Sequence, residues 1–397
     1  MVIGEDYGEG ASVVQERTHA YAMKSCMLLL DPRPELSVMV DMVEHAFAMS
    51  EASNMPAMME LRIRACHVRG SFVCKDNRIA PVSTKSMMAE PAPFDYSRLA
   101  HPPVTFGHEK RKLEHRLPAA RQYILDHQLN EAFSGKHESV GIIVQGGLSN
   151  ALLRSLQQFG LTDAFGETQV PLLILNVTYP LVPDQIAEFV QNKKAVLVLE
   201  EGAPEYIEQE IATLLNRRNF STRLHGKDML PVAGELTPEI IMGGLQQFFA
   251  RHLSEVDTGY VKTQLDATSA RRLSMASKLD KALPTRPPGF CIGCPERPVF
   301  SALKLAQKDV DEVHIAADIG CHSFATFEPF SMGHSILGYG MSLASRAAVS
   351  PMMQRRVLSI MGDGGFWHNG LLTGVQSALF NGDDAVLLIF KNGYTSA

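Results

Sequence analysis

The sequence lacks a long hydrophobic run, and no window reaches the eighteen or more apolar residues of a membrane span. Its start, Met1–Asp6, has no basic region followed by an apolar stretch, so it does not read as a signal peptide. Cysteine is scarce, with six residues in 397, which is too few for a disulfide framework. Together these absences predict a cytoplasmic protein that does not act in a membrane.

An excess of basic charge is also absent. The chain has 43 acidic and 37 basic side chains, a net charge of −6, which argues against nucleic acid or an anionic membrane as the main partner. A hydrophobic content of 45% and a charged content of 20% are typical of a globular protein. The length predicts two or three domains.

Strand-like and helix-like segments alternate in three blocks, which predicts an α/β fold of several doubly wound parallel sheets. The expected domains are 1–90, 135–255 and 289–397. The expected linkers are 91–134, which opens with prolines and continues as a polar helix over 107–133, and 256–288. Both ends look cut, so we expect a piece of a larger chain.

One unit predicts a metal–diphosphate site. Val357–Phe366 reads as a buried strand, a Gly-Asp-Gly turn and a helix start, and Leu387–Gly393 reads as a second strand ending in asparagine. A parallel crossover brings the carboxyl ends of two strands side by side, so Asp363 and Asn392 can share one ion. Mg²⁺ prefers such hard oxygen ligands and is completed by phosphates and water.

The glycines of this unit, Gly362, Gly364 and Gly365, let the backbone approach phosphates closely, and the helix start offers free N–H groups. Gly-Asp-Gly alone is common and marks a plain strand-to-helix turn more often than a site. The spacing to Asn392 is what favours a cofactor site, and it indicates thiamine diphosphate.

Four further segments, together with the Gly-Asp-Gly turn itself, allow a closer match. They are Cys291-Ile-Gly-Cys-Pro-Glu-Arg-Pro298, Ala317-Asp-Ile-Gly-Cys321, Met332-Gly-His-Ser335, Gly362-Asp-Gly364 and Phe366-Trp-His-Asn-Gly-Leu371. They resemble the diphosphate-binding domain of indolepyruvate:ferredoxin oxidoreductases, a thiamine-diphosphate-dependent family. Upstream, Tyr179-Pro-Leu-Val-Pro183 and Val196-Leu-Val-Leu-Glu-Glu201 look like the family's transketolase-C-like middle domain, and residues 1–90 look like the end of its pyrimidine-binding domain.

The resemblance implies oxidative decarboxylation of a 2-oxoacid, here an aryl pyruvate, to acyl-CoA, with coenzyme A as co-substrate and ferredoxin as electron acceptor. Thiamine diphosphate and Mg²⁺ are the implied cofactors. The implied metal ligands are Asp363, Asn392 and the backbone carbonyl of Tyr394. The implied cofactor-binding residues are Cys291, Gly293, Cys294, Asp318, Ile319, Gly320, Cys321, Met332, Gly333, Gly362, Asp363, Gly364, Gly365 and Asn392.

Parts of such an enzyme are not identifiable here. The glutamate that activates the cofactor belongs early in the pyrimidine-binding domain, before the position of Met1, and Glu5 and Glu9 do not match it. The [4Fe-4S] clusters and a further catalytic domain or subunit are expected elsewhere in the full protein. By the same resemblance we expect a dimer, since the cofactor normally lies between two domains, often of different chains.

Several candidate site residues have more than one interpretation. Cys291-x-x-Cys294 is read as a wall of the cofactor pocket, ahead of a redox pair or half a metal site, because a cluster needs four thiolates. His322 and His368 are candidates for a cation or proton donor near the substrate carboxylate. Met332 either props the cofactor or fills the core.

Two motifs near the start of the sequence give weaker evidence of function. The glycines at 4, 8 and 10 lack the spacing of a nucleotide loop and are read as a turn. The cluster Arg62, Arg64, His67 and Arg69 alternates along an expected strand and is read as a solvated face, with a docking or coenzyme A surface as the alternative.

Three functions remain open. They are part of an indolepyruvate-type oxidoreductase, another thiamine-diphosphate decarboxylase or synthase, and a non-catalytic diphosphate-binding subunit. The domain order and the Cys-x-Gly-Cys-Pro segment favour the first.

Overall fold

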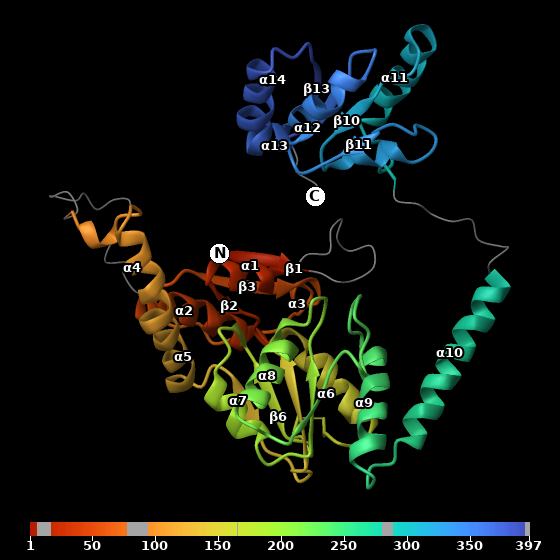
Figure 1. Ribbon diagram of the computed structural model, residues 1–397. Coiled ribbons are helices and arrows are strands. Elements are labelled where there is room, and N and C mark those ends of the chain that lie inside the picture. The colour runs from red at the N-terminus through yellow and green to blue at the C-terminus, as the bar shows by residue number, and fades with distance from the viewer. Residues whose placement is uncertain (6–16, 78–93, 165, 280–288, 394–397) are drawn as a thin grey trace. The chain divides into compact units, whose positions relative to one another are not determined.

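The computed structural model describes residues 1–5, 17–77, 94–164, 166–279 and 289–393 (Figure 1). The chain divides into two compact units, Met1–Met275 and Ala276–Ala397. The boundary falls within the expected linker 256–288. Part of that linker is the long helix α10 (Gly259–Leu279), and residues 280–288 lie outside the described part.

The first sheet of unit 1 is built mainly from residues 1–62. Its strand order is β1-β3-β2-β7, with β1, β3 and β2 parallel and β7 antiparallel to β2. Helix α2 covers this sheet, and its inner face packs on Leu28 and Met59. The elements are β1 (Val2–Glu5), α1 (Thr18–Ser25), β2 (Leu28–Leu30), α2 (Leu36–Ser53), β3 (Ala57–Arg62), α3 (Ile63–Cys66) and β7 (Val177–Tyr179).

The second sheet of unit 1 has the order β4-β6-β5-β8-β9, and all of its strand pairs are parallel except β4 with β6. Helices α6 and α9 pack on one face, and α7 and α8 on the other (Figure 1). Every residue of β5 and β8 is buried, as expected for a central strand covered on both faces. The elements are β4 (Glu131–Phe133), β5 (Val140–Gln145), η3 (Gly146–Leu148), α6 (Ser149–Gln158), β6 (Leu172–Leu175), α7 (Pro183–Val190), β8 (Ala195–Leu199), α8 (Tyr206–Arg217), β9 (Arg223–His225) and α9 (Pro238–His252).

The expected linker 91–134 is more structured than the sequence indicated. Instead of one helix over 107–133, it contains a helical segment that ends at Asp126 and the edge strand β4. Leu117, Ala120 and Ile124 are buried against α2 and join the core of the first sheet. The helical elements are η1 (Tyr96–Arg98), α4 (Val104–Arg111), the π-helical turn η2 (Lys112–Arg116) and α5 (Leu117–Asp126).

Unit 2 has one parallel sheet with the order β11-β10-β12-β13. Its core joins Phe300 of α11, Met332 and Phe390 of β13. The elements are α11 (Arg297–Val310), β10 (Ile315–Ala317), η4 (Cys321–Thr326), β11 (Ser335–Ile336), α12 (Ser342–Val349), η5 (Ser350–Met352), β12 (Leu358–Gly362), α13 (Asp363–Gly365), the π-helical η6 (Phe366–Val375), α14 (Gln376–Phe380) and β13 (Val386–Phe390).

These sheets confirm the predicted α/β class, since strands and helices alternate and parallel pairs predominate. No disulfide bond joins any of the six cysteines, all of which lie among the described residues. Within the described residues, no helix combines the length and the apolar character needed to cross a bilayer.

A buried charged network joins the carboxyl ends of the two sheets in unit 1. Arg62, at the end of β3, pairs with Asp31 at 2.9 Å and with Glu60 at 3.2 Å, and it also contacts Glu201, which follows β8. Arg17 pairs with Glu200 at 2.5 Å. All of these groups are buried.

The interpretation of Arg62 as part of a solvated face is therefore wrong. Only 3% of its side chain is exposed, because β3 ends where the second sheet presents its carboxylates. The strand also stops at Arg62, so the expected alternation through Arg69 does not continue. Of the three glycines read as a turn, Gly4 lies in β1, and those at 8 and 10 lie outside the described residues.

Candidate cofactor site

The predicted pair Asp363 and Asn392 follows two neighbouring parallel strands of unit 2. Strand β12 pairs with β13 from Leu358 to Gly362, so both residues emerge at the same edge of the sheet. The Asp363 carboxylate accepts hydrogen bonds from the backbone N–H groups of Gly364 and Gly393, each at 3.0 Å. This carboxylate therefore bridges the helix start after β12 and the loop after β13.

A third strand brings another acid to this edge. Asp318 follows β10, the other neighbour of β12, and is fully buried. Its Oδ2 accepts the Gly340 N–H at 2.8 Å, and its Oδ1 lies 2.5 Å from Nε2 of His322. His322 is buried and stacks on Phe390. These contacts hold the His322 imidazole in one orientation.

Glu296 belongs to the same group and was not selected from the sequence. Its Oε1 accepts a hydrogen bond from Asn392 Nδ2 at 3.4 Å. Burial raises the pKa of the Glu296 carboxyl, the nearby His322 opposes this rise, and Asp318 and Asp363 add to it. The residue stood inside the quoted Cys-Pro-Glu-Arg segment, but no local signal distinguishes it, because its partner lies 96 residues away.

The remaining predicted residues are placed as follows. Cys291 is exposed and Cys294 half-buried, in a turn where the Cys294 N–H donates to the Cys291 carbonyl at 3.2 Å. Met332 is a buried core residue beside Phe300 and Phe330. Ile319, Gly320 and Cys321 continue from Asp318 into η4, and Gly333 has a positive φ of 93°.

His368 is exposed on η6, and its ring lies 5.2 Å from that of Tyr339. The structure does not bring it to Asp318 or Asp363 by any contact between described residues. Tyr394, the third predicted metal ligand, lies outside the described residues.

The donor atoms at this edge fit a hard divalent cation with a diphosphate. Carboxylate and amide oxygens are the ligands Mg²⁺ prefers. Among the described residues, Glu296 Oε2 is buried with no hydrogen-bond partner, which is the kind of group a bound ligand satisfies. Across the described part of the chain, no cluster of three or more His, Cys, Asp or Glu side chains is arranged to hold a metal. A cation here would therefore depend on phosphate and water for much of its shell.

The backbone is also close-packed here. A Cβ added at Gly365 would lie 2.1 Å from Asp318 Oδ2, whereas one added at Gly362 would meet nothing closer than 3.9 Å. We expect Gly365→Ala to destabilise unit 2 by about 1–3 kcal/mol through overpacking, and Gly362→Ala to cost less. Urea unfolding read by Trp367, the only tryptophan, measures both. Equal costs would contradict the packing described here.

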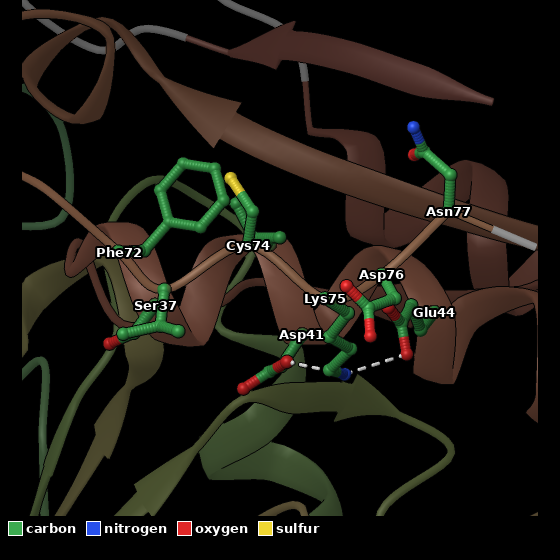
Figure 2. Close-up of a pocket in the computed structure, with 10 residues that line it drawn as sticks. Ser37, Asp41, Glu44, Phe72, Cys74, Lys75, Asp76 and Asn77 are labelled. Carbon is green, nitrogen blue, oxygen red and sulfur yellow. Dashed lines mark hydrogen bonds and ion pairs between the residues drawn. The ribbon is translucent and has the colours of Figure 1, made fainter.

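A hollow in unit 1 is a weaker candidate for a functional site than the edge of the unit 2 sheet. It measures about 680 Å³ and lies between α2 and the segment Phe72–Asn77. Figure 2 shows Lys75 reaching both Asp41 and Glu44, at 3.0 and 2.8 Å. All three side chains are more than half exposed, so these ion pairs contribute little and indicate no binding site.

Residues 318–397 match the family described as thiamine pyrophosphate enzyme, C-terminal TPP binding domain. The whole chain is similar to indolepyruvate oxidoreductase subunit IorA of Methanothermobacter thermautotrophicus, with 27% identity over 96% of this chain and 57% of that protein. Nearly every part of this chain therefore resembles a part of IorA. The subunit IorA of Pyrococcus abyssi is 23% identical over all of this chain and 60% of that protein.

The predicted resemblance to indolepyruvate oxidoreductases is thus confirmed. The chain spans a little over half the length of these IorA relatives. Among solved structures, the 2-oxoglutarate:ferredoxin oxidoreductase from Magnetococcus marinus with 2-oxoglutarate, coenzyme A and succinyl-CoA bound aligns with a TM-score of 0.40 and 14% identity. That alignment covers 62% of this chain and 48% of the other.

Proposed function

We propose that this chain is the thiamine-diphosphate-binding portion of an indolepyruvate-type oxidoreductase subunit. The observation that carries the proposal is the Asp363 carboxylate, which bridges the ends of β12 and β13 inside the segment that matches a TPP binding domain. IorA is named as a subunit, which supports a multi-subunit enzyme. We assign residues 1–90 to a pyrimidine-binding-type domain, 135–255 to a transketolase-C-like domain and 289–397 to the diphosphate-binding domain.

In this proposal the residues of unit 2 hold the diphosphate and its cation. Asp363 and Asn392 supply ligands to Mg²⁺, with Tyr394 as a third through its carbonyl. The helix that starts at Asp363 directs backbone N–H groups toward the phosphates, and its dipole favours their negative charge. When bound, thiamine diphosphate supplies the carbon centre that adds to a 2-oxoacid and accepts the electrons released by decarboxylation.

The buried imidazole of His322 is oriented by Asp318, so its ring can hold a proton at a fixed position beside the site. His368 remains the second candidate for the substrate carboxylate. We assign an aryl pyruvate as substrate, coenzyme A as acyl acceptor and ferredoxin as electron acceptor, with the clusters and the activating carboxylate outside residues 1–397.

Binding of thiamine diphosphate with Mg²⁺ tests this proposal directly. A ligand that binds only the folded state raises the melting temperature, and at 100 times Kd it adds about 2.7 kcal/mol of stability. We expect a rise for the wild-type chain and at least a tenfold weaker affinity, about 1.4 kcal/mol, for Asp363→Ala. Calorimetric titration measures the same affinity.

Asp384→Ala is the matched control, because Asp384 is exposed, pairs with Arg356 and lies outside the edge where Asp363 sits. It should bind like the wild type. An absence of binding by the wild-type chain, or equal binding by the Asp363 variant, would overturn the assignment.

A further inference from the structure

Glu296 stands at the N-cap of α11 but does not cap that helix. No hydrogen bond joins its side chain to the first turn, and only 4% of the residue is exposed. A glutamate in this position normally gains from helix N–H groups or from solvent. Here the carboxyl is instead directed to Asn392, whose Nδ2 donates to Oε1 at 3.4 Å. The burial of this acid is therefore not explained by the helix that carries it.

The hydrogen bond from Asn392 fixes which way its amide faces. A carboxylate accepts hydrogen bonds, so the amide nitrogen is the atom turned toward Glu296. The amide oxygen is then the atom that faces away. Only that oxygen can bind a hard cation, because an amide NH₂ group is a donor. An amide free to flip would present the wrong atom in part of the population.

We propose that Glu296 is a positioning residue that holds the Asn392 amide with its oxygen oriented for the cation; this rests on the proposed function of the Asp363–Asn392 edge. Glu296 acts through Asn392 and not as a ligand itself. Its effect requires a hydrogen-bond acceptor and does not require a negative charge. A glutamine can accept from Asn392 through its own carbonyl oxygen, whereas alanine cannot.

The experiment compares Glu296→Ala and Glu296→Gln by calorimetric titration of Mg²⁺ in the presence of saturating thiamine diphosphate. We expect alanine to weaken Mg²⁺ binding by about tenfold, the upper range for the loss of one hydrogen bond, and glutamine by no more than about threefold. Urea unfolding of each variant, read by Trp367, separates loss of orientation from loss of the fold. Glu312→Ala is the control, because Glu312 is exposed and its Oε1 lies 3.4 Å from Nε2 of His334.

The Asn392→Asp background provides a stricter readout. An aspartate has two equivalent oxygens and needs no orientation, so adding Glu296→Ala in that background should not weaken Mg²⁺ binding further. The same tenfold loss in both backgrounds would mean that Glu296 acts structurally or by its charge, and would overturn the inference. If the wild-type chain binds no Mg²⁺ with thiamine diphosphate, the proposed function itself fails. If it binds and Glu296→Ala binds equally well, only the role of Glu296 fails.

Discussion

Replacing Arg62 with methionine is expected to destabilise unit 1 by about 3–5 kcal/mol. The guanidinium pairs with Asp31 and Glu60 and contacts Glu201, and all four side chains are nearly inaccessible to solvent. Removing it leaves carboxylates buried without their counter-charge, which costs more than the ion pairs themselves contribute. Methionine keeps much of the apolar volume, so the loss reports the charge and not a cavity.

The measurement is urea unfolding followed by a pulse of hydrogen exchange, with the peptides of residues 17–77 analysed by mass spectrometry. This readout isolates the region, since Trp367 reports only on unit 2. Arg98→Met is the matched control, because Arg98 forms an exposed ion pair with Asp95 at 3.3 Å. That substitution should cost less than about 1 kcal/mol. A similar cost for both arginines would refute the assignment of the network as a buried junction.

The contacts of this network could not be predicted from the sequence. The sequence around β3 gives no sign that Arg62 meets Glu201, 139 residues later. Local alternation distinguishes two faces of a strand, and it cannot identify what covers the end of that strand. The short strands β4 and β9 also went unpredicted, because three-residue strands at sheet edges carry little periodicity.

The candidate site was more accessible to sequence reasoning. Asp363 and Asn392 each follow a buried apolar strand, and the parallel crossover rule places such ends together whatever the rest of the fold does. The Asp318–His322 contact spans only four residues, and His322 directly follows the quoted segment Ala317–Cys321. Glu296 could not be selected in this way, because its role depends on the tertiary meeting of α11 with the loop after β13.

Unit 1 is also expected to lose stability as pH rises, through Glu60. This carboxyl lies beside Arg62 in β3 and interacts with Glu5 of the adjacent strand β1, which pairs in register with Arg62. Burial is the largest cause that raises the pKa of Glu60 well above 4.5, and Asp31 and Glu5 raise it further, while Arg62 opposes them. The pKa of Glu5 is raised as well, again mainly by burial. Glu5 Oε1 has no hydrogen-bond partner among the described residues, and one proton shared between the Glu5 and Glu60 carboxyls would provide one.

The direction of this change in stability with pH follows from proton binding. Because the folded-state pKa of Glu60 exceeds its unfolded value, the folded protein binds more protons between the two, and its stability falls as pH rises through that interval. The stabilisation is complete below about pH 4.5 and is lost as pH passes the folded value. Glu60→Gln stays neutral at every pH. Its stability relative to the wild type should therefore grow by up to about 1.4 kcal/mol per pH unit.

Comparing wild type with Glu60→Gln at pH 5, 7 and 9 isolates this group, because the other titrating side chains are common to both proteins. Unfolding in urea at each pH, followed by exchange pulses at one fixed pH, gives the difference for residues 17–77. Glu188→Gln, an exposed substitution on α7, should follow the wild type. A constant difference between wild type and Glu60→Gln would mean that Glu60 is already ionised at pH 5. In that case the excess negative charge of the junction would need a bound cation, and stabilisation of the wild type by added Mg²⁺ or K⁺ would identify it.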